Sequence, residues 1–314
     1  MNSRCSAARV SPIIKRYTEE GFVPNVRIFL CSAALSILLV GCGSLPADKL
    51  TAFSTGVTTA KSQTTTAFAA VNDLTSAEVI DYAASQPKLL DENFYDVLDP
   101  ASIAKWETAF EALEKYSQSL ILLTSPDATK EYKDATGELA SQISETGAKL
   151  KKEGLISKGP TFSPGFATAF AELGNVLLKA KASRDAKNTL RAVDPTVQRI
   201  FHNMADSIEP IRSTVHSNWV LKKKEKSIEF MGAPDQSTKR SIAVGYSELK
   251  GKEDAQDRVL ASLQRSLRAL ADAHHALAQD SKFEVVAAVA IVKQEANDTK
   301  DIYNRMKTAT GSEH

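Results

Sequence analysis

Cysteine is scarce in this chain of 314 residues, which contains three of them. Cys5 and Cys31 precede Cys42, and no cysteine follows it. The region after Cys42 can therefore form neither an internal disulfide nor a zinc site built on several thiolates. A domain in that region depends on its hydrophobic core, which roughly 270 residues can supply.

Catalytic and metal-binding motifs are also missing. The chain contains no Glu-x-x-His, His-Glu-x-x-His, Gly-x-Ser-x-Gly or Gly-x-x-x-x-Gly-Lys-Ser/Thr pattern, which removes the sequence support for di-iron, zincin, hydrolase and phosphate-loop chemistry. Two acid–histidine pairs have helical spacing, namely His202 with Asp206 and Asp272 with His275. We predict no catalytic residue, no metal site and no cofactor, while a triad assembled from distant positions stays open.

Charge of one sign does not predominate either. Of 39 basic and 38 acidic side chains, residues 1–41 contain five and two, so residues 42–314 contain 34 and 36. A near-neutral domain has no sequence-wide attraction for nucleic acid, and we expect no nucleic-acid partner. The densest basic run, Lys222–Lys226, is interpreted as a solvated helix face, with contact to anionic lipid as the alternative.

One apolar run is present near the start of the chain. Residues 28–40 are predominantly apolar and directly follow Arg27. A positive flank followed by about 7–15 apolar residues is typical of a secretory signal, whereas a spanning helix needs about 20. We therefore predict an export signal rather than a permanent membrane span.

The run ends in Leu39, Val40, Gly41 and Cys42, which resemble the lipobox of bacterial lipoproteins. The resemblance implies that the first three are recognition positions for the processing enzymes, and that signal peptidase II cuts before Cys42. It also implies a diacylglycerol on the Cys42 sulfur and an N-acyl chain on the new amine, which together hold a domain durably at a membrane. An ordinary cleaved signal or a short uncleaved anchor is the alternative.

The residue after the cysteine is Gly43. In enterobacterial lipoproteins, Asp at this position favours retention at the inner membrane. For a Gram-negative host, the resemblance therefore implies an outer-membrane lipoprotein that faces the periplasm. The resemblance covers residues 1–42 and implies nothing about the domain behind them.

Helical periodicity dominates the chain from residue 51, and no segment alternates as a half-buried strand does. Residues 51–71 are predicted to form a weak amphipathic helix, with a solvated stalk as the alternative. A helix is expected from Phe166 to about Arg191, and Pro210 is expected to kink its helix without ending it. Further helix boundaries are expected at Asp99-Pro100, Ser125-Pro126-Asp127, Gly154, a loop at 155–164, Asp194-Pro195, Gly232–Asp235 and Asp280-Ser281.

The most regular apolar stripe steps by three and four residues, which is typical of helices packed side by side with coiled-coil-like contacts. His274 lies in this stripe and is interpreted as a packed helix residue rather than a ligand. The apolar segment Phe283–Val292 is predicted to be a buried helix, with a membrane-entering or partner-binding patch as the alternative. The stripe consists of Leu260, Leu263, Leu267, Leu270, His274 and Leu277.

These features predict an all-α protein, an elongated up-and-down bundle of about six or seven helices after a lipoprotein signal peptide. Its parts are a signal peptide at 1–41, a lipidated tether at 42–50 and a helical bundle at 51–314. We expect a non-enzymatic, lipid-anchored protein of the cell envelope that binds or scaffolds an envelope protein through its helical surface. A membrane-active, pore-forming-like protein is the second hypothesis, and a metal-binding or enzymatic helical domain is the third.

Overall fold

The structure, a computed structural model, describes residues 47–94, 96–122, 131–154, 164–180 and 186–311. All of them belong to the unit formed by residues 44–314. They form seven α-helices and one short 3-10 turn, with no strand in these ranges, and the predicted all-α class is confirmed. None of these helices combines the length and the apolar character needed to cross a membrane.

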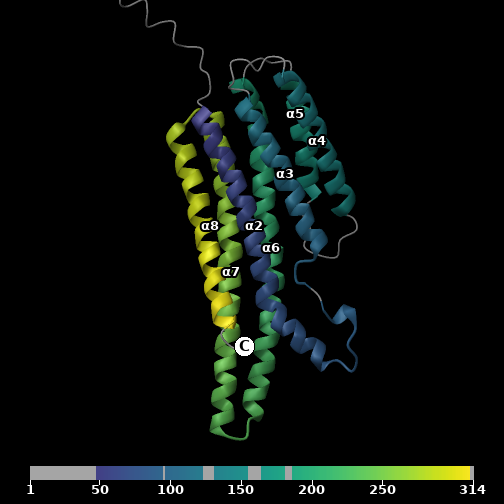
Figure 1. Cartoon of the computed structure of the whole chain (residues 1–314), viewed down its shortest axis with the longest axis vertical. Helices are drawn as coiled ribbons and strands as arrows, with labels where there is room; N and C mark the ends of the chain where they lie inside the picture. The colour runs from purple at the N-terminus through teal and green to yellow at the C-terminus, as the bar shows by residue number, and fades with distance from the viewer. Residues whose placement is uncertain (1–46, 95, 123–130, 155–163, 181–185, 312–314) are drawn as a thin grey trace, which may run out of the picture. The chain divides into compact units, whose positions relative to one another are not determined.

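The helices pack as a bundle in which neighbours in sequence are neighbours in space (Figure 1). Each helix contacts the next one along the chain, and α2 also contacts α7 and α8, so the first and last helices close the bundle. The elements are α2 (Ala47–Ser85), η1 (Asp91–Asn93), α3 (Pro100–Leu122), α4 (Glu131–Gly154), α5 (Pro164–Ala180), α6 (Ala186–Gly232), α7 (Gln236–Ala278) and α8 (Lys282–Gly311).

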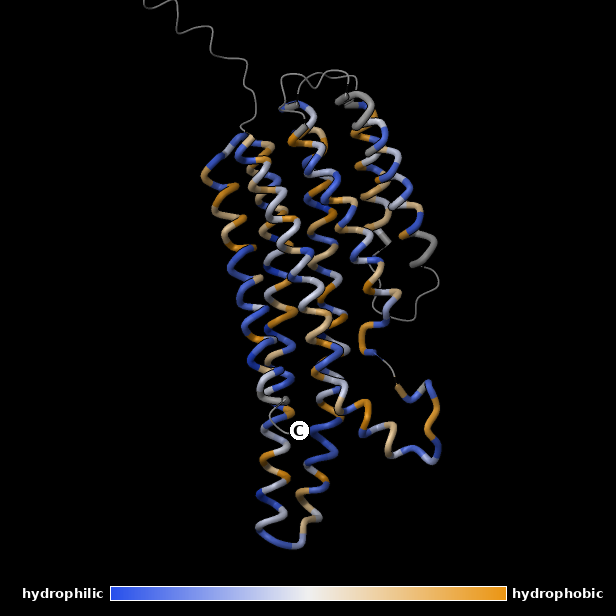
Figure 2. The backbone as a smooth tube through the Cα atoms, in the orientation of Figure 1, coloured by the Kyte–Doolittle hydropathy of each residue, from blue (hydrophilic) through white to orange (hydrophobic). Residues whose placement is uncertain are grey.

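The core follows the apolar stripes of the helices, and Figure 2 shows hydrophobic residues recurring turn by turn along them. Every member of the predicted α7 stripe, from Leu260 to Leu277, is fully buried. Phe53 of α2 contacts this stripe at His274, with ring centroids 5.4 Å apart, and meets Phe201 of α6 edge to face at 6.3 Å. The stripe of α7 therefore packs in the centre of the bundle, as predicted.

Although α2 contains many threonines, it is a continuous helix. Its threonine hydroxyls donate to carbonyl oxygens four residues earlier, for example from Thr55 to Thr51 at 2.9 Å and from Thr59 to Thr55 at 2.8 Å. Each of these hydroxyls finds its acceptor within the helix, so the threonines do not require a non-helical backbone to satisfy their side chains. The helix predicted for residues 51–71 is confirmed, and the solvated stalk is wrong.

The first turn of α2 is fastened to the turn between α7 and α8. The helix begins at Ala47 and so takes in the last four residues of the range predicted as a tether. Lys49 is buried, and its Nζ lies 2.6 Å from Asp280 Oδ1 and 3.1 Å from the Asp280 carbonyl oxygen. Asp48 pairs with Lys282 at 2.7 Å. Asp280 has a φ of 63°, which reverses the chain after α7.

Several predicted helix boundaries are present in the structure. Asp99 caps α3, since its carboxylate accepts a hydrogen bond from the Ser102 N–H at 2.9 Å. Asp235 caps α7 by accepting from the Thr238 N–H at 2.9 Å. The first N–H groups of a helix have no carbonyl acceptor within the helix, and these two carboxylates accept hydrogen bonds from them. The Ser125-Pro126-Asp127 start and residues 155–163 of the predicted loop lie outside the described residues.

The middle of the chain differs from the prediction. The single helix expected over 166–191 is two helices, because α5 ends at Ala180 and α6 begins at Ala186. Helix-favouring residues on both sides hide this break from periodicity. The start predicted at Asp194-Pro195 is wrong, because this pair lies inside α6, which also continues through Pro210. Each proline removes one backbone hydrogen bond, and the Asp194 side chain bonds in the core instead of capping a helix.

Two glycines allow α4 and α5 to approach closely. A Cβ added at Gly174 of α5 would lie 2.8 Å from the Ala140 carbonyl oxygen of α4. One added at Gly147 of α4 would lie 2.9 Å from the Ala167 carbonyl oxygen of α5. At Gly245 of α7, by contrast, no atom lies within 4 Å of an added Cβ.

We expect Gly174→Ala to lower the free energy of unfolding by about 1–3 kcal/mol, because the added methyl group overlaps the α4 backbone. Gly245→Ala should instead raise it by about 0.5–1 kcal/mol, because alanine is the better helix former and has room at this position. Urea unfolding followed by circular dichroism measures both values. Equal effects of the two substitutions would contradict the close contact of α4 with α5.

Leu267→Ala should cost about 2–5 kcal/mol, because it leaves a cavity in the centre of the α7 stripe. The matched control is Asp272→Ala on the exposed face of the same helix, which should stay within about 0.5 kcal/mol of the parent protein. Chemical unfolding of the purified protein gives both values. A loss below about 0.5 kcal/mol at Leu267 would place that side chain in solvent and contradict the bundle at this helix.

Candidate functional site

A network of polar side chains lies in the core where α3, α6 and α7 meet. His274 of α7 has its Nδ1 2.8 Å from Asp194 Oδ1 of α6 and its Nε2 2.7 Å from the Tyr116 hydroxyl of α3. The second Asp194 oxygen lies 2.8 Å from His275 Nδ1 and 2.8 Å from Gln198 Nε2. These five residues form one hydrogen-bonded set, which we call the Asp194 network.

Burial determines the protonation states in the Asp194 network. Burial lowers the pKa of His274 more than its hydrogen bond to Asp194 raises it, so the imidazole is neutral near pH 7. Burial also raises the pKa of Asp194, but the hydrogen bonds from His274 and His275 outweigh it and the pKa is lowered. The pKa of Tyr116 is raised well above its ordinary value by burial. Neutral His274 therefore donates from Nδ1 to the carboxylate and accepts from the tyrosine hydroxyl at Nε2.

The order of acid, histidine and hydroxyl matches that of a catalytic triad, so access decides what the network can do. Tyr116 and His274 are both 0% exposed. No substrate reaches either side chain unless the core opens. The network instead satisfies buried polar atoms and joins three helices. The interpretation of His274 as a packed helix residue is confirmed.

The acid–histidine pairs noted in the sequence have other partners. His275 bonds to Asp194 on α6, not to an acid of its own helix. His202 is exposed, and Asp206 lies 3.5 Å from Arg268. Within the described ranges, no three His, Cys, Asp or Glu side chains are grouped so that they could hold a metal ion.

The protein should lose stability as the pH falls from 7 to 5. The lowered pKa of His274 means that, near the ordinary pKa of 6.5, the unfolded chain binds more protons than the folded protein does. This proton uptake lowers the free energy of unfolding as the pH falls, by at most about 1.4 kcal/mol for each pH unit. Urea unfolding of His274→Gln should show a smaller pH dependence than the parent protein, and the exposed control His202→Gln should not. An unchanged dependence in His274→Gln would contradict this assignment.

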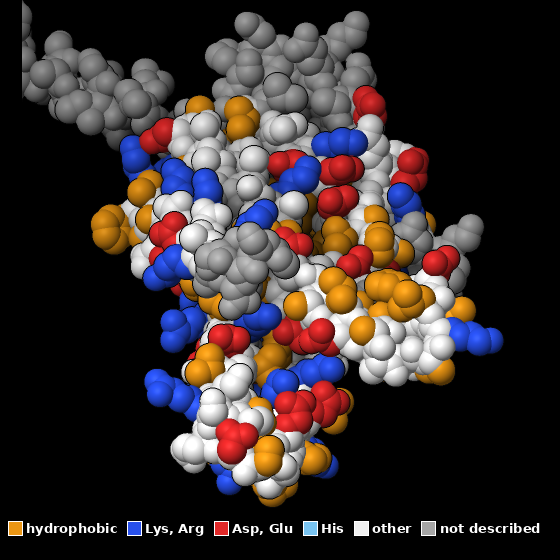
Figure 3. Space-filling view, turned by 60° about the horizontal axis from the view of Figure 1, so that its bottom comes forward, with side chains coloured by type: hydrophobic (Ala, Val, Ile, Leu, Met, Phe, Trp, Pro, Cys, Tyr) orange, Lys and Arg blue, Asp and Glu red, His pale blue; other side chains and the backbone are white. Residues whose placement is uncertain are grey.

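Parts of α6 and α7 form a two-helix hairpin at the bottom of Figure 1. Of residues 220–252, all of which the structure describes, none is buried, although Trp219 and Ala255 beside them are. We call residues 220–252 the α6–α7 extension. Figure 3 looks toward this end and shows hydrophobic side chains among lysines and acids. The large exposed apolar residues of the extension are Val220, Leu221, Ile228, Phe230, Met231, Val244 and Tyr246.

The contacts within the extension are mostly polar. Along α6, Lys222 pairs with Glu225 at 3.3 Å and Lys226 pairs with Glu229 at 2.8 Å. These pairs favour a solvated helix face over lipid contact for the basic run 222–226. An apolar hollow of about 330 Å³ between the two helices stays open to solvent, and its lining includes Phe230, Met231, Ile242, Ala243 and Tyr246.

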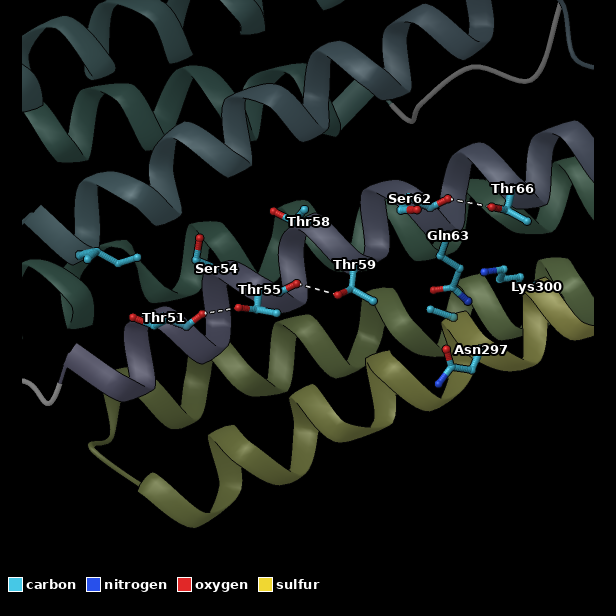
Figure 4. Close-up of a pocket in the computed structure, with 12 residues that line it drawn as sticks. Thr51, Ser54, Thr55, Thr58, Thr59, Ser62, Gln63, Thr66, Asn297 and Lys300 are labelled. Carbon is cyan, nitrogen blue, oxygen red and sulfur yellow. Dashed lines mark hydrogen bonds between the residues drawn. The ribbon is translucent and has the colours of Figure 1, made fainter.

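A polar groove of about 520 Å³ follows the outer face of α2 (Figure 4). Its threonine and serine hydroxyls come from α2, and Asn297 and Lys300 of α8 lie opposite them. Gln63 Oε1 is buried there with no protein partner, while its Nε2 donates to Thr299 Oγ1 at 3.0 Å. Lys300 is the one charged group among the lining residues, so the groove specifies no ligand class.

The first turns of α8 differ on their two faces. The predicted buried helix at Phe283–Val292 is right for the inner face, where Val285, Val289 and Val292 are buried, and wrong for the outer face. One face is exposed because α8 lies at the edge of the bundle. Among the described elements, α8 packs mainly against α2 and α7. We define the α8 outer stripe as Phe283, 85% exposed, Val286, 52% exposed, and Ile291, 47% exposed.

Comparisons with protein-family models, with curated proteins and with solved structures found no match for this chain. The predicted processing and lipidation residues, Leu39, Val40, Gly41 and Cys42, lie outside the described residues. The extension was not predicted as a separate feature. Its signal in the sequence is that the apolar stripes stop at Trp219 and resume only near Leu260.

Proposed function

We propose that this protein is a lipoprotein of the cell envelope that binds an envelope protein through the α6–α7 extension. Acyl chains on Cys42 hold it at a membrane, and its role is that of a scaffold. The lipobox-like residues 39–42 support the anchor, and Gly43 favours the periplasmic face of the outer membrane in a Gram-negative host. The uncovered apolar residues of the extension support the binding surface.

The length of α7 separates the anchored end from the extension. α2 starts five residues after Cys42, and its first turn is bonded to the turn that follows α7. α7 has 43 residues and so measures about 64 Å at 1.5 Å per residue. The tip of the extension therefore lies about that far from the end of the bundle that follows the lipid, and residue 252, the last of the extension, lies about 39 Å from it.

One observation carries the proposal, namely that residues 220–252 include no buried side chain although many are large and apolar. Most helical stability in proteins comes from packing of an apolar face, and Leu249 is the one apolar residue of this hairpin that packs, partly buried, against the core. A clustered, uncovered apolar surface of this kind marks a protein-binding site. A partner that covers Ile228, Phe230 and Met231 would supply the missing burial.

Photocrosslinking in membranes, followed by affinity purification, tests the proposal. The double variant Ile228→Lys/Met231→Lys should lower the yield of a crosslinked envelope protein by about tenfold or more, because charges enter an apolar contact. The control Leu178→Lys changes a leucine that is 47% exposed on α5 and should leave the yield within about twofold. Cys42→Ala should abolish fatty-acid labelling and release the protein from membranes.

Two results would overturn the proposed function. One is equal loss of the crosslink in the Leu178 control and the extension variant, because the effect would then not depend on the extension. The other is a specific turnover by the purified protein that a single substitution abolishes. Circular dichroism of each variant checks that the helices remain folded.

A further inference from the structure

The α8 outer stripe begins at the end of the bundle where α2 starts. Lys282, which precedes the stripe, pairs with Asp48 in the first turn of α2 at 2.7 Å. At about 100° per residue, Val286 lies about 60° to one side of Phe283 around α8 and Ile291 about 80° to the other, so the three share the broad outer face opposite the buried valines. The stripe spans eight residue steps, about 12 Å along the helix axis.

The chain between Cys42 and α2 is short. Five residue steps at about 3.5 Å each allow at most about 18 Å between the Cys42 and Ala47 Cα atoms. A lipid on Cys42 therefore holds the start of α2, and the start of the α8 outer stripe beside it, close to the bilayer surface. A protein partner would have to enter this narrow space, whereas the bilayer is already there.

The charges around the stripe also suit a bilayer surface. Residues 282–293 contain Lys282 and Lys293 at their two ends and one acid, Glu284, and Lys282 is paired with Asp48 of α2. Both lysines are exposed. Long lysine side chains reach headgroup phosphates while apolar neighbours enter the boundary between headgroups and acyl chains. Phe283 is the largest of these apolar side chains and the most exposed.

We propose that the α8 outer stripe rests on the phospholipid bilayer that holds the lipidated Cys42. Phe283 enters the boundary between headgroups and acyl chains, and Lys293 faces the phosphates. This contact fixes how the bundle is oriented on the membrane, which a lipid on Cys42 alone does not. The proposal rests on the proposed lipid anchor.

Site-specific fluorescence of the full-length lipoprotein in vesicles tests this contact. The purified protein is reconstituted into phosphatidylcholine–phosphatidylglycerol vesicles that contain spin-labelled lipid. An environment-sensitive dye is placed at Val286→Cys or, as a matched control on the extension, at Met231→Cys, which is 75% exposed. Spin-labelled lipid should reduce emission at position 286 by about twofold or more and leave position 231 in water, quenched by iodide. Adding Phe283→Ser should weaken the lipid quenching at 286.

The outcomes separate this contact from the proposed function. Mass spectrometry that finds no lipid on Cys42 overturns the anchor and this contact together. A lipidated protein whose dye at 286 is quenched by iodide but not by lipid overturns the bilayer contact alone. A dye shielded from both quenchers shows that protein covers the stripe, which also overturns it. Release of dye trapped in the vesicles overturns it in favour of a membrane-active protein.

Discussion

A carboxylate taken out of water needs hydrogen-bond donors, and this requirement at Asp194 determines how α3, α6 and α7 meet. The Asp194 side chain is 8% exposed and receives donors from His274 and His275 of α7 and from Gln198 of its own helix. Apolar contacts are non-directional and tolerate a helix that slides by a turn. The Asp194 network does not, because such a shift would leave buried polar atoms without partners.

The parts of the fold that depend on local spacing could be predicted from the sequence. The helix at 51–71, the α7 stripe and the break at Asp280-Ser281 each follow from residues within a few turns of one another. The Asp194 network could not be predicted, because Asp194 and His274 are 80 residues apart and neither position carries a local signal of the other. The break before Ala186 was missed because helix-favouring residues lie on both sides of it.

The exposed apolar residues of the extension and of the α8 outer stripe lie toward opposite ends of α7. The core of the bundle is closed, and His274 and Leu277 at the end of the α7 stripe are fully buried. The extension lies beyond the first turns of that stripe, and the α8 outer stripe begins just after α7 ends. Exposed apolar surface favours association with other molecules, which is a disadvantage for a protein that acts alone. Large apolar side chains are also exposed between Ile80 and Phe94 and at Leu178, so exposure is not confined to the two proposed contacts.

The continuity of α7 has a mechanical consequence. Gln236–Ala278 is one uninterrupted helix, so its two ends are joined by a single column of backbone hydrogen bonds. Such a column acts as a lever whose arm is about 64 Å. Under the proposed lipid anchor, a tilt of about 10° at the membrane end of the bundle would carry the far tip through about 11 Å. A small change of tilt at the bilayer would therefore displace the proposed binding surface by a much larger distance than the anchored end.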